Sequence, residues 1–315
     1  MMTPTATASP ISASGPRAPA TRKHVMPGFA FSMGYTLFYL SLFVLIPLAG
    51  LVIKSSQLSW AKFWQTVTDQ HVVASYRLSL QASLAAALIN AFFGLIVAWV
   101  LVRYQFFGRR FFDAVVDFPF ALPTAVAGLT FASLFMRIPY LDSITLGTWI
   151  TSAWNAFPGR LGFLQLDPVT LSGLNEIKVI LMLTFVSLPF VIRSVQPVLQ
   201  DWDVEMERAA HSLGAGPWRT FRKVVFPELF PAWLSGVALA FARAVGEYGS
   251  VVFITGNIPG KSQIAPLQIM DKLDQVTPEG YLQATAIGVV LLCISLAVLL
   301  FINGIQWWAR RRENR

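Results

Sequence analysis

The stretch DWDVEMERAAHSLGAGPWRTFRKVVFP, Asp201–Pro227, is a charged and amphipathic island between two long apolar segments. Asp201 and Asp203 can cap the start of a helix, because an aspartate side chain accepts hydrogen bonds from free backbone amides. Glu205 and Glu207 then fall in the first turn, where the positive end of the helix dipole favours carboxylates. The pattern predicts a short helix that begins just after the two aspartates.

The end of this helix is marked as well. The small residues Ala209 and Ala210 are followed by Gly214, and glycine permits the left-handed turn that commonly ends a helix. Gly216 and Pro217 restart the chain, since proline suits the first position of a helix. We therefore expect a short helix, a tight turn and a second helix at the membrane surface, a shape that can dock into a partner's groove.

The composition identifies the environment of the chain. Charged residues make up only 13% of it, and the mean hydropathy is +0.58. A soluble domain carries about twice that charged fraction. The chain is therefore predicted to be an all-α integral membrane protein. Its single cysteine, Cys293, lies in an apolar run and is expected to be a small buried hydrophobe.

Six transmembrane helices are predicted. The clearest is a 25-residue uncharged run flanked by Arg77 and Arg103, and it would form a helix of about 37 Å, enough for a hydrocarbon core of about 30 Å. The six predicted spans are Phe29–Ile53, Leu78–Val102, Ala114–Met136, Lys178–Leu199, Phe226–Thr255 and Leu282–Ile305.

The distribution of Lys and Arg predicts the orientation. With the N-terminus inside, the inner segments hold fourteen of these residues and the outer segments eight, so both termini are expected in the cytoplasm. The net charge of +8 follows this orientation and is not taken as a sign of nucleic-acid binding. Residues 1–26 are predicted to be a disordered cytoplasmic tail, 27–307 a transmembrane domain, and 308–315 a basic cytoplasmic tail.

Two predicted outer segments have features of their own. Leu58–Val67 carries three aromatic residues and is expected to form an interfacial helix, since aromatic side chains favour that depth. Arg137–Ile177 is long and contains Trp, Pro and Gly. It is interpreted either as an interfacial re-entrant segment, which we favour, or as a contact for an external partner.

Prolines and charges inside the spans indicate candidate path residues. Pro119 and Pro123 interrupt the third span, where Thr124 and other small residues permit close helix contact. Such a segment can line a translocation path or simply pack against another helix, and both readings stay open.

Arg193, Arg243 and Glu247 lie within predicted spans, where charges usually face protein or a water-filled cavity. Arg243 and Glu247 are four residues apart, so they can form an ion pair on one helix face, a transport site, or both. For Arg193 we favour slightly that its side chain reaches the inner interface.

A nucleotide-binding or catalytic role is not supported. Gly256–Ser262 resembles a phosphate-binding glycine-rich loop, but three residues separate its glycines where four are required. The sequence shows no hydrolytic triad and no metal-ligand cluster, and its three histidines are scattered. No cofactor or metal is expected, and the chain is predicted not to be an enzyme.

The central stretch resembles the cytoplasmic coupling motif of ABC-importer permeases, which reads Glu-Ala-Ala, three residues, Gly, nine residues, Ile-x-Leu-Pro. The matching positions here are Arg208-Ala209-Ala210, Gly214 and Val224–Pro227. The departure is Arg208, which stands where the family has glutamate. The resemblance implies that Glu205 or Glu207 takes over the orienting role of that acid, and that the motif contacts an ATPase.

Other segments indicate which group of ABC-importer permeases the chain resembles. DFPFALPTAVAGLTFASLF, LPFVIRSVQPVLQD, ARAVGEYGSVVFITGNIP and IAPLQIMDKLDQ resemble the T-type permease subunits of bacterial sulfate/thiosulfate ABC importers. The molybdate/tungstate permeases share the coupling motif but usually lack the first span, so they are the alternative. An ATP-independent secondary transporter is a second alternative, although an inverted repeat, the usual sign of that class, is not evident.

This resemblance implies a type I importer fold in the bacterial cytoplasmic membrane. The implied partners are a second homologous permease, two ATPase subunits, an external sulfate/thiosulfate-binding protein and the lipid membrane. An oxyanion needs positive potential or donors along its route, and Arg243 is the cation within a span that we expect to provide it. The other expected path residues are Glu247, Arg193, Pro123 and Thr124.

Overall fold

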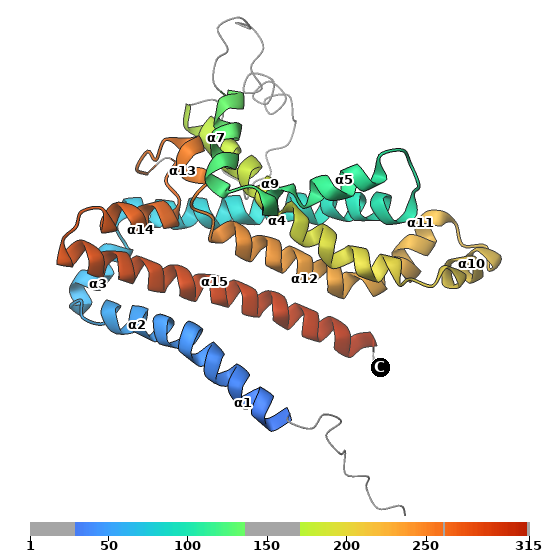
Figure 1. Ribbon diagram of the computed structural model, residues 1–315, viewed down its shortest axis with the longest axis horizontal. Helices are drawn as coiled ribbons and strands as arrows, with labels where there is room; N and C mark the ends of the chain where they lie inside the picture. The colour runs from blue at the N-terminus through green and yellow to red at the C-terminus, as the bar shows by residue number, and fades with distance from the viewer. Residues whose placement is uncertain (1–28, 136–170, 261, 314–315) are drawn as a thin grey trace, which may run out of the picture. The chain divides into compact units, whose positions relative to one another are not determined.

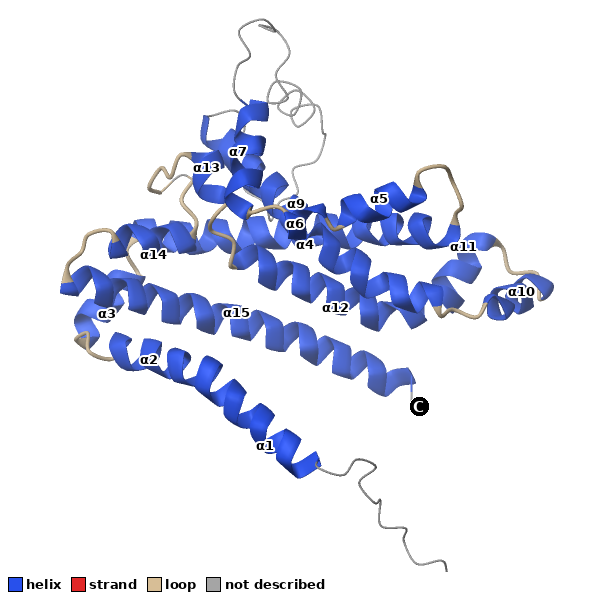
Figure 2. Cartoon of the chain, viewed as in Figure 1, coloured by secondary structure: helices blue, strands red, loops and turns tan. Residues whose placement is uncertain are grey.

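The computed structural model describes residues 29–135, 171–260 and 262–313, and in these ranges the regular structure is helical (Figures 1 and 2). The chain divides into two compact units, Met1–Gly50 and Leu51–Arg315. The predicted tail 1–26 and most of the loop Arg137–Ile177 lie outside the described residues.

The first unit contains α1 (Phe29–Leu40), the π-helical turn η1 (Ser41–Leu45) and the start of α2 (Ile46–Ser55). The apolar run Phe31–Ser55 is long enough to cross a membrane. Its large apolar side chains are mostly exposed, as expected of a helix that lipid or a partner covers.

Three long helices form the core of the second unit: α4 (Gln70–Arg103), α9 (Leu171–Gln200) and α12 (Phe226–Val245). Small residues bring them together. A methyl group on Gly94 of α4 would lie 3.0 Å from Val191 Cβ, and one on Gly236 of α12 would lie 2.8 Å from Val191 Cα. Two glycines thus let α4 and α12 pack closely against the same point of α9.

Three further helices belong to the second unit. The last helix, α15 (Pro278–Glu313), packs against α12 and α14 (Ala265–Leu273), as Figure 1 shows. The short helix α3 (Trp60–Val67) begins where the Ser59 hydroxyl accepts a hydrogen bond from a backbone amide. An ion pair between Lys62 and Glu279 joins α3 to α15. The helix predicted within Leu58–Val67 is confirmed, while its interfacial depth stays a prediction.

Two of the predicted spans are broken. The third, Ala114–Met136, covers the end of α5 (Arg109–Val116), α6 (Phe118–Ala121) and α7 (Thr124–Phe135), so the interruption predicted from its prolines is confirmed. Pro123 explains the break between α6 and α7, because the residue before a proline is driven out of helical geometry, and Leu122 is extended.

The fifth span differs from the prediction. Helix α12 ends at Val245, and α13 (Val251–Thr255) follows after a non-helical turn, so Phe226–Thr255 is not one helix. Five helical segments in the described residues are long and apolar enough to cross a membrane, and Thr124–Ser133 is a shorter apolar helix. Six membrane segments therefore agree with the structure, one of them short.

The last predicted span, Leu282–Ile305, lies within α15, whose apolar membrane-length segment is Pro278–Ile305 and whose helix runs on to Glu313. The predicted burial of Cys293 is wrong, because its side chain is exposed on α15 in this chain.

Candidate functional site: a coupling hairpin and two helix breaks

The segment between α9 and α12 forms the predicted helix–turn–helix, which we call the coupling hairpin (residues 201–227). Its first helix is α10 (Val204–Ser212), capped by Asp203, whose Oδ1 accepts a hydrogen bond from the Glu205 amide at 2.9 Å. Gly214 has φ +80°, the left-handed conformation that favours glycine. Ala215 N–H then donates to the Ala210 carbonyl at 3.0 Å, which closes the turn.

The second arm starts at Pro217, the first residue of α11 (Pro217–Thr220). It continues through the π-helical turn η2 (Phe221–Val225) into α12, where Pro227 lies in the first turn. Pro217 therefore stands where a missing amide hydrogen costs no helical hydrogen bond, whereas Pro227 follows the π-helical turn within the helical run Pro217–Val245.

The two candidate acids of α10 have different partners. Glu207 forms an ion pair with Arg103, the last residue of α4, and both side chains are about one-fifth exposed. Glu205 pairs instead with Arg208 on the open surface, where the two side chains are 68% and 70% exposed. Arg208, at the motif position of the acid, therefore faces outward, while Glu207 faces the membrane domain. The spacing of residues in the sequence did not indicate that Glu207 pairs with Arg103.

Apolar side chains of the hairpin are exposed as well. Met206, Leu213 and Trp218 present 56%, 89% and 72% of their surface. An exposed group of large apolar side chains beside charged residues is typical of a protein–protein contact.

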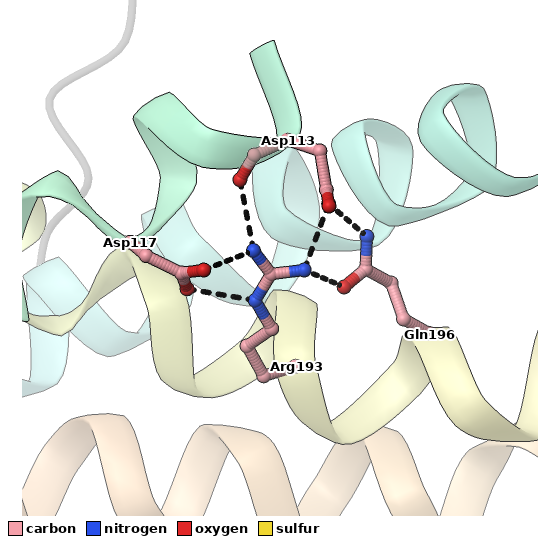
Figure 3. A network of polar contacts seen from close by, with 4 residues as sticks. All are labelled: Asp113, Asp117, Arg193 and Gln196. Atoms are coloured by element: carbon pink, nitrogen blue, oxygen red, sulfur yellow. Dashed lines mark hydrogen bonds and ion pairs between the residues drawn. The ribbon is translucent and has the colours of Figure 1, made fainter. Parts of the chain in front are cut away.

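The first helix break is held by Arg193 of α9, as Figure 3 shows. Its Nε and Nη2 donate to the two carboxylate oxygens of Asp117 at 2.8 and 2.6 Å, and its Nη1 donates to Asp113 Oδ1 at 2.8 Å. Gln196 Nε2 also donates to Asp113 Oδ1, at 3.1 Å. Asp113 lies on α5 and Asp117 lies at the junction of α5 and α6. The Arg193 guanidinium therefore holds that junction against α9.

This environment changes the acidity of Asp113. Burial acts to raise the pKa of the Asp113 carboxyl, but the hydrogen bonds from Gln196 and Arg193 outweigh it, and the pKa lies below its usual value. Neither Asp113 nor Asp117 was among the predicted site residues. The four-residue spacing of these two aspartates, which places them on one helix face, was the available signal.

The second break follows α12. Arg243 Nη1 donates to Glu247 Oε2 at 2.5 Å, which confirms the ion pair predicted from the four-residue spacing. Glu247 is only 2% exposed, and its other oxygen accepts hydrogen bonds from Ser250 N at 3.0 Å and Ser250 Oγ at 2.8 Å. One buried carboxylate thus joins the end of α12 to the start of α13.

The turn at the second break packs against the start of α7. A methyl group on Gly249 would lie 2.5 Å from Thr124 Oγ1, and one on Gly128 would lie 2.4 Å from the Ser250 carbonyl oxygen. The predicted path residues therefore fall into two groups. Thr124, next to Pro123, lies against the turn that Glu247 holds, whereas Arg193 belongs to the separate network at the α5–α6 junction.

The arrangement supplies donors, ion pairs and helix breaks. Arg243 is about one-third exposed, so its side chain is not fully enclosed by the protein. Among the described residues, no group of three His, Cys, Asp or Glu side chains could hold a metal ion. A broken, partly polar pair of helices within an apolar domain is the architecture of a membrane transport component.

Comparisons with known proteins agree with this class. Residues 90–313 match the family described as "Binding-protein-dependent transport system inner membrane component", and the chain belongs to that family. It is 44% identical over 285 residues to the "Sulfate transport system permease protein CysT" of Salmonella typhimurium (strain LT2), covering 90% of this chain and 94% of that protein. The corresponding Escherichia coli (strain K12) protein is 42% identical over 284 residues, with coverage of 90% and 94%.

A solved structure supports the fold. The "bacterial ABC transporter involved in the import of the acidic polysaccharide alginate" superposes with a TM-score of 0.63 at 14% identity, covering 90% of this chain and 95% of its own. The predicted ABC-importer permease fold is therefore confirmed, and the chain is a transport subunit rather than an enzyme.

Proposed function

We propose that this permease subunit translocates sulfate, with thiosulfate as a related substrate, across the bacterial cytoplasmic membrane. The observation that carries the proposal is the likeness to proteins named as sulfate transport permeases over nine-tenths of the chain. Molybdate or tungstate import is the alternative within the same class. Movement through the path is driven by ATP hydrolysed on separate subunits.

The coupling hairpin is the proposed docking site for an ATPase. Its exposed Met206, Leu213 and Trp218 offer apolar area, and Glu205 and Arg208 add polar contacts at the rim. Ala209 and Ala210 permit close approach, Gly214 provides the turn, and Pro227 starts the span that follows.

The complex is proposed to hold a second homologous permease, two ATPase subunits and an external anion-binding protein. A structural neighbour described as an alginate ABC transporter "in complex with alginate pentasaccharide-bound periplasmic protein" supports the last of these partners.

The proposed path runs beside the break before α7 and the break after α12. Pro123 and the turn after α12 interrupt their helices at neighbouring points, so backbone groups and the Thr124 hydroxyl become available there as donors. Arg243, whose side chain is partly exposed, supplies a guanidinium for the oxyanion, and Glu247 holds that guanidinium in place. Arg193 braces the α5–α6 junction that flanks the path.

Both termini and the coupling hairpin are proposed to face the cytoplasm. A cysteine probe at Ile258, which is 45% exposed in the loop after α13, should react with an impermeant reagent from outside. A probe at Leu213 of the hairpin should not react. The reverse pattern contradicts the orientation and the docking site.

Uptake of radiolabelled sulfate tests the function. A strain that lacks this chain is compared with the same strain carrying it, with and without a tenfold excess of molybdate. We expect uptake that requires the chain, depends on the ATPase and resists molybdate. Uptake that persists without the ATPase indicates a secondary transporter, and competition by molybdate indicates the alternative substrate.

A further inference from the structure

We infer that the ion pair between Arg103 and Glu207 is a rigid joint through which the coupling hairpin moves α4 during transport. This inference rests on the proposed function, because it assigns the route by which an ATPase movement reaches the membrane domain. Arg103 ends α4, a core helix, and Glu207 lies on α10, 104 residues further along the chain.

The burial of this pair separates it from an ordinary surface contact. Arg103 and Glu207 are 18% and 22% exposed, whereas the neighbouring Glu205–Arg208 pair is 68% and 70% exposed. Salt and water screen a partly buried pair much less than an exposed one. The Arg103–Glu207 contact therefore holds one arrangement, while the exposed pair exchanges freely with water.

The end of α4 contacts the second arm of the hairpin as well, through Trp99. Its guanidinium carbon lies 5.0 Å from the centroid of the Trp99 ring, within the range of a cation–π contact. Trp99 packs edge-on against Phe221 of η2 at 5.4 Å, and Phe221 stacks with Trp218 of α11 at 5.7 Å. The inner end of α4 is thus linked to α10 by charge and to η2 by aromatic packing.

Two attachments on opposite arms fix both the position and the tilt of the hairpin relative to α4. A push on the exposed face of α10 then displaces the end of α4, and α4 packs along α9 and α12. Glu207 acts here as a positioning residue that points into its own subunit. Arg208 is left as the outward-facing charge of the motif.

Charge reversal in the complete complex tests the joint. Arg103→Glu and Glu207→Arg are compared with the double exchange, and the readout is sulfate imported per ATP hydrolysed, with ATPase binding measured in parallel. Glu279→Gln, which breaks the exposed Lys62–Glu279 pair, is the control. Each single variant should bind the ATPase, but its sulfate imported per ATP hydrolysed should fall about tenfold. A change of this size is within the usual range of coupling free energies. The double exchange should recover most of the sulfate import per ATP that the single variants lose.

A wild-type ratio in either single variant overturns the inference, and so does a double exchange that recovers nothing. A wild-type complex that hydrolyses ATP but imports no sulfate contradicts the proposed function instead. The two failures are therefore distinguishable.

Cross-linking provides a second test that needs no charged replacement. In a Cys293→Ser background, Arg103→Cys and Glu207→Cys are joined with a short bifunctional thiol reagent. Because the joint is rigid, uptake should be low before the reagent is added and should rise after it. Uptake that stays low, or falls further, when the two positions are linked shows that they must move apart, and this contradicts the joint.

Discussion

An arginine–carboxylate interaction stabilises each of the two helix breaks, at the α5–α6 junction and after α12, but the carboxylates differ in exposure. At the α5–α6 junction, Arg193 reaches across from α9 to Asp113 and Asp117, whose side chains are about half exposed. After α12, Arg243 and Glu247 belong to one chain segment, and Glu247 is 2% exposed. A pair open to water costs little to separate, whereas a buried carboxylate without its partners is strongly unfavourable. We therefore expect the first break to be held less firmly than the second during transport.

The largest effect is expected from Glu247→Gln. The change removes the charge that compensates Arg243 and weakens the two hydrogen bonds from Ser250. We expect a loss of about 3 kcal/mol in the free energy of unfolding, as for breaking one partner of a buried pair. Thermal unfolding of the purified subunit measures it. A change below about 1 kcal/mol, the range of an exposed pair, contradicts the contrast between the breaks.

Gly128→Ala should have the next largest effect. The new methyl group would lie 2.4 Å from the Ser250 carbonyl oxygen, so α7 must shift away from the braced turn. Overpacking of this kind costs about 1–3 kcal/mol. Gly304→Ala is the matched control, because its methyl group meets nothing within 4 Å in this chain. Equal melting temperatures for the two variants show that the turn is not fixed.

Gly214→Val tests the coupling hairpin. Gly214 has φ +80°, where a residue with a side chain costs about 1–2 kcal/mol and a β-branched one is especially disfavoured. We expect the turn to change and transport-coupled ATPase activity to fail while membrane insertion persists. Gly216→Val is the control, since Gly216 has φ −71° and open space around it. Normal coupled activity in Gly214→Val counts against the hairpin as a docking site.

The smallest effect concerns pH. The pKa of Asp113 is lower in the folded chain than its ordinary value of 3.8, so its contribution to stability is full above the unfolded pKa and is lost as pH falls through the folded pKa. The difference in melting temperature between wild type and Asp113→Asn should be modest at about pH 5 and shrink towards about pH 3. A difference that grows on acidification contradicts this assignment.

The sequence predicted features that depend on neighbouring residues. The cap at Asp203, the turn at Gly214, and the Arg243–Glu247 pair follow from local spacing, and the structure confirms them. Pro123 predicted the break before α7. The break after α12 was missed because glycine alone costs a helix only about 1 kcal/mol, so tertiary contacts decide whether the helix ends.

The long-range pairs could not be predicted in the same way. Arg193 and Asp113 are 80 residues apart, and Arg103 and Glu207 are 104 apart. Helical periodicity shows which face of a helix a residue occupies but not which helix packs on that face. Arg103 was counted only as a charge that sets orientation, although the packing of α4 against the hairpin gives it a specific partner.

Sulfate uptake by Arg243→Ala, Glu247→Gln and the double variant tests most directly whether the second break belongs to the transport path. Each single change leaves one charge without its partner, and the double change removes both charges. We predict that the double variant regains the stability that Glu247→Gln loses through the unpaired Arg243 charge, while sulfate uptake stays abolished, because the anion needs the Arg243 guanidinium. Recovery of uptake in the double variant would show that Arg243 serves only as the partner of Glu247.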